Sequence, residues 1–118
     1  NHVAAGTESL DDRTRAVEAL GMRFTHFPIP DFGTPDLEAA TALVRDIVGD
    51  LGRGQRLVMH CFAGLGRAGT IAACVLVATG LEAGEAIRQV RSARPGAIQT
   101  DGQQRFIAAF ADRHRTAP

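Results

Sequence analysis

Apolar residues recur at helical spacing in five segments of the chain, and shorter apolar runs lie between some of them. This pattern predicts helices over 9–21, 35–51, 68–79 and 82–94, and a last helix after Thr100 that carries Phe106, Ile107 and Phe110. Strands are predicted over 22–27 and 56–60, with residues 1–5 as the remnant of a third. Strands that alternate with helices indicate a parallel sheet between helical layers.

Particular residues mark where these helices begin. Thr34 is a suitable N-cap for the second helix, with Pro35 at the first helical position. Thr100 and Gln103 have the spacing of a capping box, in which each side chain bonds the other residue's backbone. The second helix is expected to turn one apolar side to the core, formed by Leu37, Ala40, Val44, Ile47, Val48 and Leu51.

We therefore predict a single α/β domain over residues 1–118, with a central, mostly parallel sheet flanked by helices. Two clear strands are too few for such a sheet, so further strands are expected upstream. The chain begins at Asn1 without an initiator Met, which fits a fragment that has lost such strands. No internal repeat or linker divides the sequence.

The composition excludes several classes of partner. The chain has 118 residues, a formal net charge of zero and 45% hydrophobic residues, which suit one small domain with a core. The balanced charge gives no reason to expect nucleic acid or a membrane surface as partner, and no apolar run could span a bilayer. Two cysteines are too few for a disulfide framework, which favours a reducing compartment. We expect a cytoplasmic monomer.

The segment 60–70 carries the strongest candidate chemistry. It joins a predicted strand to the start of a predicted helix, where unpaired N–H groups attract anions. Its glycines let the backbone bend until several amides point inward. Cys61 at its start is then favoured as a thiolate, and Arg67 at its end offers a planar fork of donors for two phosphate oxygens. The combination indicates attack of the Cys61 sulfur on a bound phosphoryl group.

With five residues between Cys61 and Arg67, the segment resembles the signature loop of the protein tyrosine phosphatase superfamily. The resemblance implies a phosphatase-like fold and a phosphocysteine intermediate on Cys61, with His60 in support. It implies that phosphate is bound by Arg67 and by the residues before it, Phe62, Ala63, Gly64, Leu65 and Gly66. No metal and no cofactor are implied. The alternative for Cys61 is an ordinary buried cysteine.

Loss of an alkoxide or phenoxide from phosphorus requires a proton donor. The segment Pro30-Asp31-Phe32-Gly33-Thr34-Pro35 resembles the acid loop of the same superfamily, which makes Asp31 the candidate donor. Most members carry Trp before the proline, whereas this chain has Ile29. Asp36 is the rival acid, but helix-dipole stabilisation alone explains an aspartate in a first helical turn. The alternative for Asp31 is an ordinary turn aspartate.

A third match lies in the segment 99–106. It resembles the glutamine loop of the superfamily, Gln-Thr-x-x-Gln followed by Phe, whose first glutamine orients the water that hydrolyses the cysteinyl phosphate. An amide suits this task because it donates to phosphate and accepts from water at once. The alternative for Gln99 is a simple capped helix start, and Gln103 is expected to be a capping partner more than a catalytic residue.

The segment 91–98 further resembles compact dual-specificity phosphatases, and its combination with the cysteine loop is similar to the kinase-associated phosphatases of cyclin-dependent kinases. This implies a phosphoprotein or phosphopeptide as substrate. Arg88, Arg91 and Arg94 recur at three-residue spacing. They either brace the phosphate loop, approach an acidic substrate, or serve only as cations near a helix C-terminus.

Two other functions stay open. A rhodanese-like sulfurtransferase also uses a loop cysteine, but its usual loop is one residue shorter and needs neither Asp31 nor Gln99. A phosphate-binding module with weak catalysis would usually lose Cys61 or Arg67, and both are present.

Two further positions qualify this picture. Cys74 lies in an apolar helix and is expected to be core, with a redox role as the alternative. Most family members place Ser or Thr directly after the loop arginine, whereas this chain has Ala68.

Overall fold

The computed structural model describes residues 2–4, 24–26, 34–55, 58–60 and 66–116. Its strands are β1 (His2–Ala4), β2 (Phe24–His26) and β3 (Val58–His60). Its helices are α2 (Leu37–Gly52), α3 (Gly66–Ala78), α4 (Ala83–Ala93) and α5 (Asp101–Thr116). The helix predicted over 9–21 lies outside the described residues.

The three strands form a parallel sheet in the order β2-β1-β3. Residues 2–4 therefore form a strand inside the predicted range 1–5, and this strand lies in the middle of the three. Ala4 is in register with His26 on one side and with His60 on the other, so all three strands end at the same edge. In open α/β sheets, ligands bind beyond this carboxyl edge. A wider sheet with helices on both faces stays a prediction.

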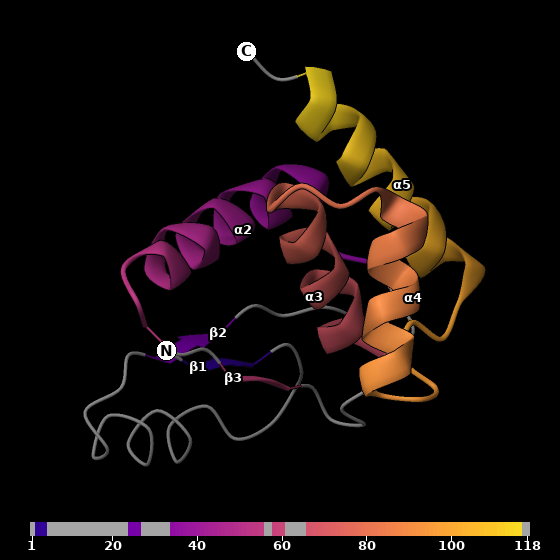
Figure 1. The fold of residues 1–118 in the computed structure, drawn as a ribbon, viewed down its shortest axis with the longest axis horizontal. Coiled ribbons are helices and arrows are strands. Elements are labelled where there is room, and N and C mark those ends of the chain that lie inside the picture. The colour runs from indigo at the N-terminus through magenta and orange to yellow at the C-terminus, as the bar shows by residue number, and fades with distance from the viewer. Residues whose placement is uncertain (1, 5–23, 27–33, 56–57, 61–65, 117–118) are drawn as a thin grey trace.

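Helix α3 lies at the centre of the helical layer. Figure 1 shows the four described helices on one side of the strands, and α3 packs against β3, α2, α4 and α5. Most of its side chains are buried, including Ile71, Val75 and Val77. Its many small residues let the neighbouring helices approach closely. The predicted core residues of α5, Phe106, Ile107 and Phe110, are buried as expected.

Helix α2 begins later than the sequence predicted. The N-cap is Asp36 rather than Thr34, because the Asp36 carboxylate Oδ2 accepts a hydrogen bond from the Ala39 backbone N–H at 2.9 Å. An aspartate satisfies an unpaired first-turn amide and also interacts favourably with the helix dipole. Pro35 therefore precedes the helix instead of opening it.

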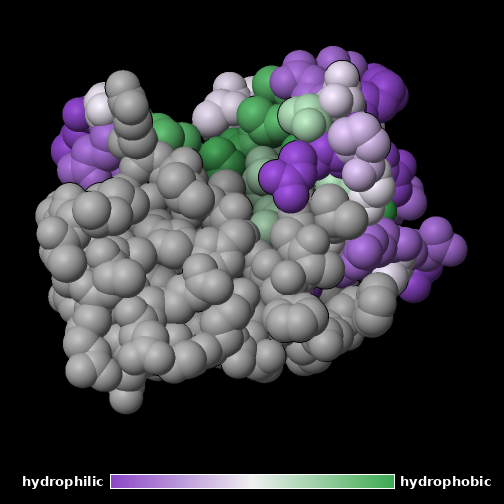
Figure 2. Space-filling model, turned by 90° about the horizontal axis from the view of Figure 1, so that it is seen from below, coloured by the Kyte–Doolittle hydropathy of each residue, from purple (hydrophilic) through white to green (hydrophobic). Residues whose placement is uncertain are grey.

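The apolar side of α2 also differs at its end. Ala40, Leu43, Val44 and Ile47 are buried, but Leu51 is 40% exposed because it lies in the last turn. Seen from below in Figure 2, hydrophilic residues form most of the coloured surface, and apolar residues show in a limited area between them. Within the part of the chain that the structure describes, no helix has the length and apolar character needed to cross a membrane.

Helix α3 begins earlier than predicted, at Gly66 instead of Ala68. Gly66 and Arg67 therefore belong to the first helical turn, not to the preceding loop. Strand β3 ends at His60 on the carboxyl edge of the sheet, and residues 61–65, which lie outside the described residues, join it to α3 in the sequence. The segment with the strongest predicted chemistry thus leaves the sheet at the edge where ligands usually bind.

Candidate active site

The first turn of α3 meets the segment that resembles a glutamine loop. A Cβ atom added to Gly66 would lie 2.5 Å from Gln99 Oε1 and 3.0 Å from Gln103 Nε2. Both amide side chains therefore lie against the helix start, at a distance that only glycine permits. Two motifs that are more than thirty residues apart in the sequence are brought together here.

Gln103 is fully buried and holds the backbone of this segment. Its Oε1 accepts hydrogen bonds from the backbone N–H groups of Gln99, at 2.7 Å, and Thr100, at 3.1 Å. In return, the backbone N–H of Gln103 donates to Thr100 Oγ1 at 3.0 Å. The predicted capping box is confirmed, and Gln103 is the capping partner. Gln99 is exposed, so its side-chain amide can face water beside Gly66.

Ile98, directly before Gln99, has an unusual backbone conformation. Its φ is 59°, in the left-handed region that β-branched residues rarely adopt, and its side chain is buried. Such a conformation costs roughly 1–3 kcal/mol and persists only where surrounding contacts enforce it. Neither glycine nor asparagine occupies this position, so the residue type does not indicate the conformation.

Arg91 of α4 provides two of these contacts. Its Nε donates to the Ala97 carbonyl at 3.1 Å and its Nη2 donates to the Ile98 carbonyl at 2.8 Å. Hydrogen bonds of charged groups contribute roughly 1.5–3 kcal/mol each, enough to offset the strain at Ile98. Of the three arginines singled out in α4 and its C-cap, Arg91 thus braces the glutamine segment, whereas the exposed Arg88 pairs with Glu85 at 2.7 Å.

Helix α3 also packs against this segment, through Gly69. A Cβ atom on Gly69 would lie 3.2 Å from the Ala97 Cβ atom and 3.4 Å from the Ile98 backbone nitrogen. Contacts this short are tighter than ordinary van der Waals separation, so glycine allows the helix and the segment to touch. Residues 97–98 therefore contact both α3 and Arg91 of α4.

Arg67 is buried in the first turn of α3, with only 4% of its surface exposed. A guanidinium stays charged at any physiological pH and needs acceptors around it when buried. Ala68 is also buried, and the Thr70 hydroxyl donates to the Gly66 carbonyl at 2.7 Å. The Thr70 hydroxyl proton is therefore already used in a hydrogen bond within the helix. The Arg67 guanidinium and the N–H groups of the first helical turn give this end of α3 a positive character.

Other predicted site residues lie outside the described part of the chain. These are Asp31, Cys61, Phe62, Ala63, Gly64 and Leu65. His60 is placed by its backbone at the end of β3. The rival acid Asp36 is the N-cap of α2, which explains its presence without a catalytic role.

Cys74 is buried in the middle of α3, as expected for a core residue. Burial in apolar surroundings raises its pKa to about 12, so the group is a neutral thiol at physiological pH. Within the described ranges, no three side chains of His, Cys, Asp or Glu are grouped so that they could hold a metal ion.

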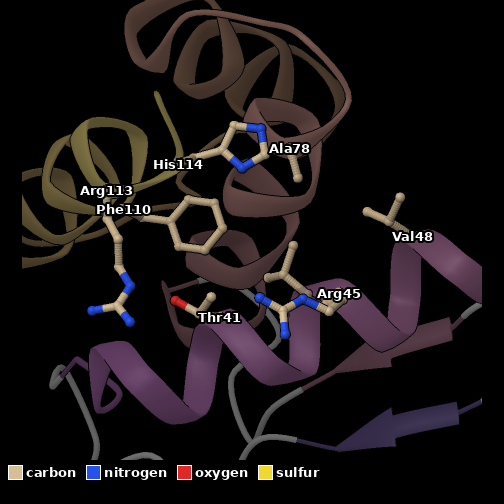
Figure 3. A pocket seen from close by; sticks show the side chains of 8 residues that line it. Thr41, Arg45, Val48, Ala78, Phe110, Arg113 and His114 are labelled. Atoms are coloured by element: carbon tan, nitrogen blue, oxygen red, sulfur yellow. The ribbon is translucent and has the colours of Figure 1, made fainter. Parts of the chain in front are cut away.

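A cavity of about 570 Å³ lies between α2 and α5 (Figure 3). Its walls combine apolar side chains with three basic ones, and its lining residues are Thr41, Val44, Arg45, Val48, Ala78, Phe110, Arg113 and His114. Ala78 ends α3 and Gly66 begins it, which separates the two by about 18 Å at 1.5 Å per residue. The cavity therefore lies away from Gly66 and Arg67, and none of the site residues that the structure describes lines it.

Comparison with known proteins identifies the protein family to which this chain belongs. Residues 3–107 match the family model described as "Swiss Army Knife protein, DSP-PTPase phosphatase domain". The chain belongs to this family of dual-specificity and protein tyrosine phosphatase domains.

Individual relatives narrow the resemblance. Over 99 residues the chain is 35% identical to rat cyclin-dependent kinase inhibitor 3, covering 81% of this chain and 47% of that protein. It is 41% identical over 91 residues to mouse protein tyrosine phosphatase domain-containing protein 1, covering 76% of this chain and 12% of that protein. The chain thus spans about half of one relative and a small part of the other.

Solved structures agree with this assignment. The crystal structure of Tk-PTP in its active form has a TM-score of 0.84 and 33% identity, covering 95% of this chain and 78% of that one. A structure of kinase-associated phosphatase, with its catalytic-site cysteine replaced by serine, has a TM-score of 0.83 and 26% identity, covering 99% and 71%. The phosphatase fold and the predicted resemblance to kinase-associated phosphatase are confirmed.

The buried state of Cys74 leads to a test by alkylation. At pH 7.5 iodoacetamide should modify Cys61 and spare Cys74, because a thiol with a pKa of about 12 carries a negligible thiolate fraction. Peptide mapping by mass spectrometry measures the two sites separately. Unfolding the protein in guanidinium should make Cys74 reactive, and modification of Cys74 in the folded protein would contradict its assignment to the core.

Proposed function

We propose that this chain is a cysteine-dependent phosphatase that hydrolyses phosphate monoesters on phosphoproteins, at phosphotyrosine, phosphoserine or phosphothreonine, through a phosphocysteine intermediate. The observation that supports this most is the packing of Gln99 and Gln103 against Gly66, the residue directly before Arg67. That packing joins a water-orienting amide to the end of a predicted phosphate loop. A sulfurtransferase would not require it, so the rhodanese-like alternative is not favoured.

In the first step, the Cys61 thiolate attacks phosphorus while the bond to the leaving oxygen breaks. The amides of residues 62–66 and the Arg67 guanidinium bind the phosphoryl oxygens, and the positive start of α3 stabilises their charge. Asp31 supplies a proton to the departing oxygen. The products are phosphocysteine and the dephosphorylated hydroxyl side chain.

In the second step, water attacks the phosphocysteine. Gln99 orients this water, and a proton of the water passes to the Asp31 carboxylate. The sulfur–phosphorus bond breaks, which gives inorganic phosphate and the Cys61 thiolate. The capping box supports this role, because it fixes the Gln99 backbone and leaves the side chain at the surface beside Gly66. Neither step uses a metal or a cofactor.

The names of the relatives support a phosphoprotein substrate. One relative is named as a cyclin-dependent kinase inhibitor, and one structural neighbour is a kinase-associated phosphatase. Both names refer to kinases, which are themselves proteins. We infer that this chain acts on a phosphoprotein or phosphopeptide, as a cytoplasmic monomer.

The covalent mechanism is tested by Cys61→Ser. Turnover of p-nitrophenyl phosphate should be lost, because a serine hydroxyl is not ionised at neutral pH. Binding of tungstate, measured by calorimetry, should persist, because Arg67 and the loop amides remain. Retention of a tenth of the wild-type rate would exclude Cys61 as the nucleophile.

The acid is tested by Asp31→Asn with Asp36→Asn as the matched control. Asp31→Asn should lower the rate about a hundredfold or more on an alkyl phosphate, and much less on p-nitrophenyl phosphate, whose leaving group needs no proton. Asp36→Asn should leave both rates unchanged, because asparagine also caps a helix. Equal losses on both substrates in Asp31→Asn would count against a proton donor.

The absence of a hydroxyl at Ala68 should slow the second step. A hydroxyl there would donate to the sulfur as it regains negative charge, and the Thr70 hydroxyl is already bonded to the Gly66 carbonyl. Losing one such donor slows a step by about one to two decades. Rapid mixing with p-nitrophenyl phosphate should therefore give a burst of nitrophenolate close to the enzyme concentration.

In the variant Ala68→Thr, the same measurement should give a smaller burst and a faster steady rate. A linear time course from the first turnover in wild-type protein, unchanged by the substitution, would rule out slow hydrolysis of the phosphocysteine.

A further inference from the structure

One guanidinium binds two successive carbonyls directly before Gln99. Arg91 donates to Ala97 and to Ile98, at 3.1 Å and 2.8 Å. In an extended backbone, neighbouring carbonyls point to opposite sides, so a single planar group could not reach both. The left-handed turn at Ile98 directs both toward α4. Arg91 therefore binds the strained form of this segment and not a relaxed, extended one.

Ile98 directly precedes Gln99, so the φ angle of Ile98 helps to set the position of the Gln99 backbone. Downstream, the Gln99 N–H is held by the buried Gln103 side chain at 2.7 Å. On the α3 side, the Gln99 amide reaches to within 2.5 Å of the position that a Cβ atom on Gly66 would take. If Ile98 relaxed to negative φ, the chain from Ile98 to Gln99 would change direction. The Gln99 side-chain amide would then move away from the start of α3.

Gly69 alone does not fix this conformation. Its contacts with Ala97 and Ile98 are van der Waals contacts, which fill space but do not select the direction of a carbonyl. Among the contacts of this segment that the structure describes, the Arg91 hydrogen bonds are the ones that depend on where the Ala97 and Ile98 carbonyls point.

We propose that Arg91 is a positioning residue for Gln99, which it serves by holding Ile98 in the left-handed conformation. This inference rests on the proposed function, in which Gln99 orients the water of the second step. Arg91 does not touch substrate. It therefore affects hydrolysis of the phosphocysteine and leaves the attack of Cys61 on substrate unchanged.

The test compares Arg91→Met with Arg88→Met. Methionine keeps the length and apolar stem of arginine in a helix but removes its donors, and Arg88 lies on the same helix in an exposed pair with Glu85. Rapid mixing with p-nitrophenyl phosphate separates the rate of the burst, which reports phosphorylation, from the steady rate. Amide hydrogen exchange of residues 97–100 reports the conformation independently of activity.

In Arg91→Met the burst rate should stay within about twofold of wild type, while hydrolysis of the phosphoenzyme should fall about tenfold, a typical loss for a misplaced catalytic group. Phosphoenzyme trapped by acid quenching should accumulate. The rate of hydrogen exchange at the Gln99 backbone N–H should rise about tenfold or more. Arg88→Met should change none of these. Arg91→Lys keeps one donor, so its hydrolysis rate should lie between those of wild type and Arg91→Met.

Equal loss of both steps in Arg91→Met would indicate a general structural role and overturn the inference. So would unchanged hydrolysis despite faster exchange. If Arg91→Met does not fold, Arg91→Lys must show the selective loss of phosphoenzyme hydrolysis. If Arg91→Lys shows no such loss, the inference is also overturned. Failure of the proposed function is distinguishable, because wild-type protein would then form no phosphoenzyme at all.

Discussion

The close approach of segment 97–103 to the first turn of α3 is the constraint on which the candidate site depends. Glycine at positions 66 and 69 permits this approach, because a Cβ atom on Gly66 would displace the Gln99 side-chain amide and a Cβ atom on Gly69 would press against Ala97 and Ile98. The approach also requires a buried glutamine whose amide satisfies two backbone N–H groups where a helix begins. Packing and hydrogen bonding thus act on the same few residues.

The sheet and α3 give this contact its chemical setting. The three strands end at a common edge, and α3 starts beyond it with a buried arginine in its first turn. Because the helix is buried along most of its length, its start is held firmly by the surrounding helices. A fixed, positively charged helix start is suited to an anion whose charge increases during reaction, since it needs no reorganisation at that moment. The same burial keeps Cys74 neutral and inert.

Much of this arrangement could be predicted because its causes are local in sequence. The spacing of Thr100 and Gln103 defines a capping box, and the apolar periodicity of α5 identifies Phe106, Ile107 and Phe110 as core. The predicted N-cap of α2 was wrong because Thr34 and Asp36 are both good capping residues. Only the fold shows that Asp36 is the one that accepts a hydrogen bond from a first-turn N–H group. Leu51 was assigned to the core because periodicity does not show where the neighbouring helices end.

The role of Arg91 and the conformation of Ile98 could not be predicted. Each depends on a contact between α4 and a segment whose direction follows from tertiary packing. Spacing drew attention to the arginines of α4, but it could not separate Arg91, which braces residues 97–98, from Arg88, which is exposed. An isoleucine at positive φ has no sequence signal, because the residue type argues against the conformation it adopts.

The most direct test of the central claim is to trap the phosphoenzyme. Wild-type protein mixed with substrate and quenched in acid within the first turnover should carry one phosphoryl group, and peptide mapping should place it on Cys61. Phosphate on Cys74 or on any other residue would contradict the account. So would the absence of a phosphoenzyme from wild-type protein and from Gln99→Ala, in which hydrolysis should be slowed.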